Sequence, residues 1–239
     1  MSIVIASVRA SVQELLRLPS FLLPLAVFPT VLYLFLGLQQ PGSTDLIYLG
    51  YCAFAILGTM MFQFGVGIAA TRDDPWNTYT LTLPGRAWQR IAALLTSGAL
   101  FSTAFCIPIS AAAFVAGKLH PLSVPTVAAV LGALLLGAIV HGLFGLALGY
   151  WLPARGAASI TNLIYFPLSF IGGLFGPVTD GLLGAIHPWS PTGAWMDLIY
   201  AALTNAPAGQ AILVGVGYAA VFAIAAGVGY RRVERTVHR

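Results

Sequence analysis

The chain has 239 residues, of which 59% are hydrophobic and only 8% are charged, and its mean hydropathy is +0.89. Soluble domains carry about 25% charged residues, so 11 Lys and Arg with 7 Asp and Glu are too few to cover a water-exposed surface of this size. These values exclude an ordinary soluble globule, a disordered chain and a collagen-like fibre. We therefore expect an all-α membrane protein.

Charge-free runs divide the chain into membrane-spanning segments. A spanning helix needs about 20 mostly apolar residues, and the charged residues fall between runs of about this length. The pattern predicts one domain over residues 1–239 with six spans, at 21–38, 46–70, 91–117, 125–151, 157–176 and 208–230. The uncharged run 181–196 is short and holds two prolines, so we interpret it as an external loop that could re-enter the bilayer.

The first eighteen residues have the pattern of an amphipathic helix. One helical face is apolar and carries Ile5, Val8, Val12, Leu15 and Leu16, and the other is polar and carries Arg9, Gln13 and Arg17. This indicates a helix over 1–18 that lies in the membrane interface and ends at Pro19. The alternative is a simple extension of the first span.

The arginines set the predicted orientation. With six spans both termini share one side, and Lys118 is the one basic residue on the other side. The side with the termini carries ten, namely Arg9, Arg17, Arg72, Arg86, Arg90, Arg155, Arg231, Arg232, Arg235 and Arg239. Because Lys and Arg are enriched in cytoplasmic loops, we expect both termini in the cytoplasm.

The predicted spans contain no Asp, Glu, Lys or Arg. Ion-coupled transporters usually place such groups at membrane depth, so the pattern points away from secondary transport, and a lone His141 is typical of hydrogen-bonded packing. Lys118 lacks the flanking residues of an ATP-binding Walker A loop, and the histidines show no metal-ligand spacing. We expect no cofactor in this chain, and no nucleic-acid partner because the basic residues border apolar runs.

Short glycine motifs within the spans predict close helix contacts. Gly145 and Gly149 form a GxxxG pair, and small residues repeat every four positions at Gly215, Ala219, Ala223 and Gly227. Small residues let helix backbones approach in lipid. Both faces therefore predict tight packing, within a subunit or between subunits.

The loop at 71–86 holds the densest charge cluster between spans. Its candidate residues are Arg72, Asp73, Asp74, Pro75, Trp76 and Tyr79. Acidic residues followed by proline are typical of a helix start, and the aromatic residues suit the headgroup level. We interpret the segment as a short helix that docks on a cytoplasmic partner, or alternatively as a loop that only anchors the spans.

The fifth predicted span contains a proline and a glycine pair. Pro167 removes a helix hydrogen bond, Gly172 and Gly173 weaken the helix further along, and Asn162 and Ser169 supply polar groups. Broken helices occur at membrane depth where protein or a water-filled cavity satisfies them. The pattern predicts a broken fifth helix beside a translocation path, with a kinked packing helix as the alternative.

This span also resembles a known family. Permease subunits of ABC-2 type export systems tend to show N-L-x-Y-x-P-L-S-F-x-G-G-L-x-x-P in their fifth span, and residues 162–177 match that string. Their cytoplasmic loop often has a Trp followed eight residues later by the Pro of an L-P pair, as Trp76 and Pro84 do here. Pro29, Tyr33 and Gly37 are similar to the family's first span.

The resemblance implies a bacterial inner-membrane exporter. A second permease, expected to be an identical copy, and two separate ATPase subunits would complete it, with ATP and Mg²⁺ held by the ATPase and membrane lipid around the permeases. The segment 72–84 would be the coupling helix. The path would be lined from spans two and five, by Phe62, Gln63, Asn162, Phe166, Pro167, Ser169, Phe170, Gly172 and Gly173.

Two other functions stay open at this point. One is a stand-alone transporter or channel that needs no ATP. The other is a membrane enzyme acting on lipids, for which Asp180, His187 and Asp197 are the candidate groups on the external side. With no charge in the spans, we expect an amphipathic or hydrophobic cargo such as a drug, an antibiotic, a lipid or a lipid-linked glycan.

Overall fold

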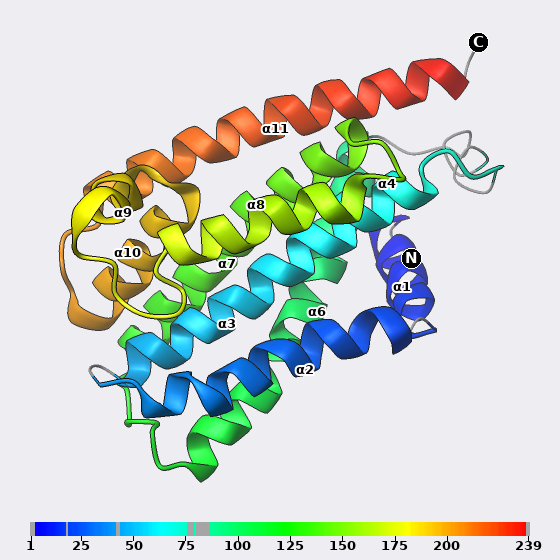
Figure 1. Cartoon of the computed structure of the whole chain (residues 1–239). Helices are drawn as coiled ribbons and strands as arrows, with labels where there is room; N and C mark the ends of the chain where they lie inside the picture. Colours follow the sequence, from blue (N-terminus) through cyan, green and yellow to red (C-terminus); the bar gives the residue numbers. More distant parts are fainter. Residues whose placement is uncertain (1–2, 18, 42–43, 76–78, 80–86, 238–239) are drawn as a thin grey trace.

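Every regular element in the described part of the chain is a helix. The computed structural model (Figure 1) describes residues 3–17, 19–41, 44–75, 79 and 87–237. The elements are α1 (Ile3–Leu16), α2 (Pro19–Phe35), η1 (Gly37–Gln39), α3 (Thr44–Met60), η2 (Met61–Val66), α4 (Gly67–Thr71), α6 (Ala87–Val115), α7 (Val124–Trp151), α8 (Ala157–Ile171), α9 (Gly181–Ile186), η3 (His187–Trp189), α10 (Pro191–Thr204) and α11 (Gly209–Val237).

Within the described ranges, five helical segments are long and apolar enough to cross a membrane. They are Leu22–Gln39, Thr44–Thr71, Trp88–Val115, Val124–Trp151 and Gly209–Arg235. The protein is thus an all-helical, multi-pass membrane protein, as expected. The predicted span at 157–176 is shorter than expected: it forms α8, whose 15 residues rise only about 22 Å against a hydrocarbon core of about 30 Å.

The helix α8 ends at a glycine pair and not at its proline. The helix continues through Pro167 to Ile171, and Gly173 then adopts a φ of +66°. Backbone with positive φ suits glycine because a side chain would be strained there. The chain therefore leaves the helix axis at Gly172–Gly173, five residues after Pro167.

The interpretation of 181–196 as an external loop is wrong. This segment forms α9, η3 and the first part of α10, and residues 191–196 are all buried. The helix α10 packs against α7 and α11. Trp195 lies over Gly137 on α7, where any Cβ would overlap the indole ring, and its Nε1–H donates to the Ala133 carbonyl oxygen over 2.9 Å.

The centre of the bundle is α3 with its continuation η2, a single segment of π-helix. Residues 47–65 are buried apart from Tyr48 and Phe62. The Gly145–Gly149 motif of α7 packs directly on this segment, because a Cβ at either glycine would overlap the carbonyl oxygen of Met60 or Phe64. The tight contact predicted for this pair is confirmed.

The small-residue stripe on α11 behaves differently. A Cβ added at Gly215 or Gly227 would meet no atom within 4 Å, and Ala223 is exposed. Among the described residues, no close contact with another helix is made at Gly215 or Gly227, so the tight packing predicted within a subunit is not found at these two positions.

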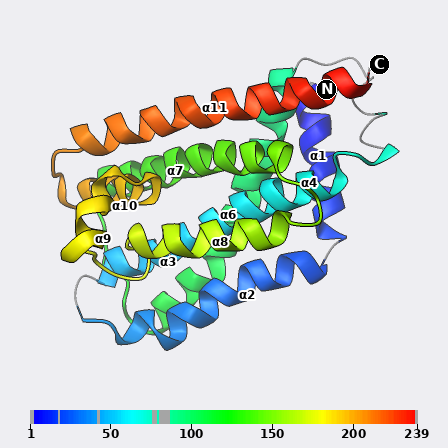
Figure 2. The same cartoon turned by 45° about the horizontal axis from the view of Figure 1, so that its top comes forward.

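Both chain ends lie at one end of the bundle. Figures 1 and 2 agree that α1, α4 and the last turns of α11 gather there. The opposite end holds the α6–α7 loop, where the His120 ring contacts Asp45 at the start of α3. On α1, Val8 and Val12 are half-buried, Arg9 and Gln13 are exposed, and the apolar Ile5 and Leu16 are exposed as well.

Candidate functional site

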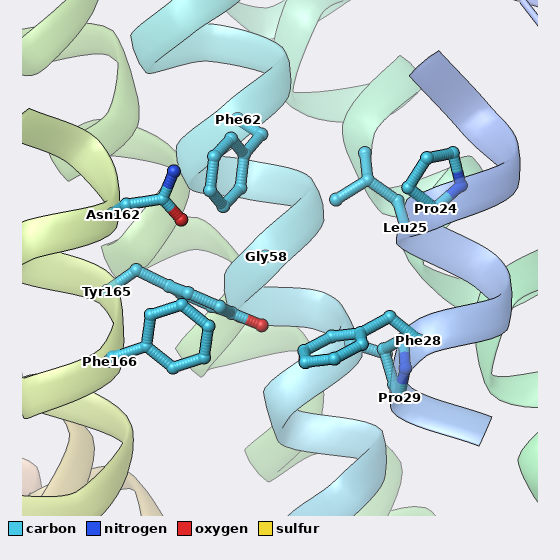
Figure 3. A pocket seen from close by; sticks show the side chains of 10 residues that line it. Pro24, Leu25, Phe28, Pro29, Gly58, Phe62, Asn162, Tyr165 and Phe166 are labelled. Atoms are coloured by element: carbon cyan, nitrogen blue, oxygen red, sulfur yellow. The ribbon is translucent and has the colours of Figure 1, made fainter. Parts of the chain in front are cut away.

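A cleft separates α2 from α8, with α3 and η2 as its floor (Figure 3). Its volume is about 270 Å³. The lining is almost wholly apolar and comprises Pro24, Leu25, Phe28, Pro29, Ala55, Gly58, Phe62, Asn162, Tyr165 and Phe166. Such a cleft can accept an apolar molecule or part of one.

Aromatic rings shape both walls of the cleft. Phe28 on α2 faces Phe166 on α8 edge-on, with 6.4 Å between ring centroids, and Phe62 meets Tyr165 edge-on at 5.4 Å. The Tyr165 hydroxyl donates to the Phe54 carbonyl oxygen over 3.2 Å. This bond ties α8 to α3, so the aromatic wall has a fixed base.

Gly58 keeps the floor of the cleft open. A Cβ at this position would lie 2.9 Å from the Tyr165 hydroxyl oxygen, closer than carbon and oxygen normally approach. Replacing Gly58 would therefore displace the Tyr165 ring and its bond to α3.

Asn162 is the one amide among the lining residues. Its Nδ2 donates to the Ala158 carbonyl oxygen of the preceding turn over 3.1 Å, and Figure 3 shows the amide group beside Phe62, above Tyr165. The amide oxygen can accept a hydrogen bond from a molecule in the cleft. The site thus combines aromatic faces with a single polar anchor.

Of the residues predicted to line the path, Phe62, Asn162 and Phe166 lie on the cleft. Gln63 does not: its side chain points to α6 instead, where Nε2 lies 3.5 Å from the Ser97 Oγ. Phe170 is exposed and packs on Phe175 with centroids 5.1 Å apart, outside the lining.

The remaining candidates on α8 and in the turn after it do not line the cleft. Pro167 is exposed and off the cleft. Ser169 is buried and donates to the Tyr165 carbonyl oxygen over 2.7 Å. Gly172 is buried where a Cβ would overlap Thr192 of α10, and Gly173 makes the turn described above.

The sequence did not identify the α2 wall or Tyr165. Pro24 and Pro29 place two ring side chains five residues apart on α2, and Phe28 lies beside them. Proline within a predicted span could have marked this helix as a wall of an open site, in the same way that Pro167 marked α8.

At the end of the bundle that carries the termini, Arg72 turns toward the bundle. Its Nη1 donates to the carbonyl oxygens of Gly149 and Tyr150, over 3.0 and 2.8 Å. Carbonyl oxygens in the last turn of a helix have no partner within the helix, and Arg72 supplies one here. The arginine therefore ties the start of the loop to the end of α7. Its Nε also lies 3.7 Å from the Asp73 carboxylate.

The remaining loop candidates are exposed where they are described. Asp73, Asp74, Pro75 and Tyr79 face outward. Trp76 and most of the predicted coupling helix lie outside the described residues.

The three groups of the enzyme hypothesis come together only in part. His187 Nε2 lies 3.3 Å from Asp197 Oδ1, and this carboxylate raises the pKa of His187 more than partial burial lowers it. Asp180 instead accepts a hydrogen bond from the neighbouring Thr179 hydroxyl. The nearby Ser190 hydroxyl donates to the His187 main-chain carbonyl oxygen and not to the imidazole ring.

His141 has the packing position expected for it. It is fully buried on α7, its Nδ1–H donates to the Gly137 carbonyl oxygen over 2.8 Å, and its ring lies 4.8 Å from that of Trp195. Across the described ranges, no group of three His, Cys, Asp or Glu residues could hold a metal ion.

Comparison with known proteins returned no match: no family model matches the chain, and no curated protein does.

Proposed function

We propose that this chain is the permease subunit of an ATP-driven ABC-2 type exporter. The observation that carries the proposal is the apolar cleft between α2 and α8. The helices that form this cleft correspond to the first, second and fifth predicted spans. Three of the residues predicted to line the path from spans two and five, Phe62, Asn162 and Phe166, are among its lining residues. No charged side chain is among the lining residues.

The lining argues for an amphipathic or hydrophobic cargo. An unpaired charge at membrane depth costs at least about 2.5–3.5 kcal/mol, and the cleft has no opposite charge to offset that cost. Its aromatic faces suit an apolar body, and Asn162 suits a single polar group. Drugs, antibiotics, lipids and lipid-linked glycans are all compatible cargo classes.

The proposed partners are a second, identical permease and two ATPase subunits that bind ATP and Mg²⁺. Support comes from the exposed acidic start of the 71–86 loop and from Arg72, whose bonds to the end of α7 would carry a movement of the loop into the bundle. The concentration of arginine at this end favours a cytoplasmic position for both termini in a bacterial inner membrane.

Co-purification tests the proposal. The tagged chain, extracted from its native membrane, should carry a nucleotide-binding ATPase with it. Trp76→Ala should reduce the amount of ATPase bound, whereas Trp88→Ala, which changes an exposed tryptophan at the start of α6, should leave it unchanged. Absence of any ATPase from the wild-type preparation would reject the proposal.

A further inference from the structure

A histidine joins three elements at the end of the bundle opposite the termini. His187 in η3 donates from Nδ1 to the Ile171 carbonyl oxygen at the end of α8, over 2.8 Å. Its Nε2 faces Asp197 Oδ1 of α10 at 3.3 Å. The His187 side chain is 14% exposed and that of Asp197 is 45% exposed, so water and protons can reach the pair.

The carbonyl group that accepts from His187 lies at the C-terminal end of α8. Ile171 is the last residue of α8, and a helix end leaves carbonyl groups without partners inside the helix. The next two residues are the glycine pair at which the chain turns away. His187 therefore gives this last carbonyl its partner. One turn earlier the Leu168 carbonyl oxygen accepts from the Thr192 hydroxyl of α10 over 2.7 Å, a bond that does not depend on pH.

Both bonds exist together only when the imidazole is protonated. A neutral ring has one N–H, so with the hydrogen on Nδ1 a nitrogen lone pair would face the Asp197 carboxylate. With the hydrogen on Nε2, the Ile171 carbonyl oxygen would lose its donor. The imidazolium satisfies both acceptors, one of them through a charge-assisted bond.

Among the described residues, Asp197 is the charged group that faces this ring. The elements packed against η3 are α9, α10 and α11. The helix α9 holds no ionisable residue, and Asp180 just before it is bonded to Thr179. The α11 residue Tyr218 donates to the Trp189 carbonyl oxygen. Asp197 is the charge that raises the pKa of His187 above its ordinary value of 6.5.

We propose that His187 is a proton-operated latch that fastens the end of α8 to α10. When protonated it adds a charge-assisted fastening to the 172–190 segment, and when it loses the proton this fastening is lost and the segment loosens. Because α8 also carries Asn162, Tyr165 and Phe166, the latch lies at one end of the helix that forms a wall of the cleft. The latch does not depend on an ATPase partner or on transport.

The direction of the pH effect follows from the raised pKa. A group whose pKa is higher in the folded state stabilises that state fully below its ordinary pKa, and this contribution is lost as pH rises through the folded-state pKa. The segment should therefore be held below pH 6.5 and loosen above it.

Hydrogen–deuterium exchange on the full chain in lipid nanodiscs between pH 5.5 and 9 tests the latch. Protection factors of amides in 172–190, corrected for intrinsic exchange, should fall by about fivefold with rising pH because the charge-assisted bond is lost. His187→Gln should give a flat profile, and Asp197→Asn should move the midpoint to lower pH. Asp45→Asn is the matched control because it breaks the other His–Asp pair, with His120, and should leave the profile of this segment unchanged.

Histidine-selective NMR of the wild-type chain gives a second measurement that needs no variant at position 187 or 197. It should show His187 titrating above pH 6.5. A flat wild-type exchange profile, an unchanged midpoint in Asp197→Asn, or a His187 midpoint at or below 6.5 would overturn the latch.

Discussion

Replacing Gly137 with alanine tests how α10 is fixed to α7. The added methyl group would overlap the Trp195 indole, so the ring would have to move and its 2.9 Å bond to the Ala133 carbonyl oxygen would be lost. Overpacking a filled site costs about 1–3 kcal/mol, a lost hydrogen bond about 1 kcal/mol, and alanine's better helix propensity returns about 1 kcal/mol. We expect the free energy of unfolding to fall by about 2 kcal/mol.

Equilibrium unfolding by SDS in mixed micelles, followed by tryptophan fluorescence, measures this loss. Gly132→Ala is the matched control on the same helix, because a Cβ there meets no atom within 4 Å; it should not lower stability and should raise it by up to about 1 kcal/mol through helix propensity. If Gly137→Ala were as stable as the control, the account of how the 181–204 segment is anchored would be refuted.

Two further substitutions test the bundle centre and the cleft. The added methyl group of Gly145→Ala would overlap the Met60 carbonyl oxygen and should lower the free energy of unfolding by about 2 kcal/mol or more. Gly227→Ala, on the open face of α11, should not lower it. If the two variants were equally stable in the same assay, the packing of α7 on η2 would be contradicted. Phe62→Ala removes an aromatic ring from the cleft and should weaken binding of a fluorescent apolar dye by about fivefold. Phe114→Ala changes an exposed ring on α6 and should leave dye binding unchanged. An equal loss of dye affinity in both variants would mean that the dye binds outside the cleft.

Charge and hydropathy located most of the helices because lipid imposes a simple rule on them. The run predicted at 125–151 became α7, Val124–Trp151. The run predicted at 208–230 became α11, which continues to Val237. The predicted span ends at Tyr230 because the charge of Arg231 marks the edge of the apolar segment, yet arginine and glutamate are good helix formers and the helix continues.

The helix α10 was missed because its prolines were interpreted as loop signals. Pro191 in fact occupies the first turn of the helix, where its missing N–H costs nothing, and Ser190 caps that turn by accepting from the Gly193 N–H over 2.9 Å. The serine–proline pair is a helix-start signal, and it could have been recognised.

The cleft was predicted in part, for a reason of geometry. Phe62 and Gln63 are neighbours within the predicted span 46–70, and both were predicted to line the path. Which of them faces α8 depends on how η2 is rotated against α6 and α7, and the close approach of Gly145 determines that rotation. No pattern within one helix contains this information.

The central claim is that the chain moves its cargo only with energy from a partner ATPase. The most direct test is cargo movement in proteoliposomes that contain the purified chain alone, the chain with its co-purified ATPase, and the pair with and without ATP. The account predicts movement only when chain, ATPase and ATP are all present, and its loss when Trp76 is changed to alanine. Equal movement by the chain alone would contradict the account and identify a stand-alone transporter or channel.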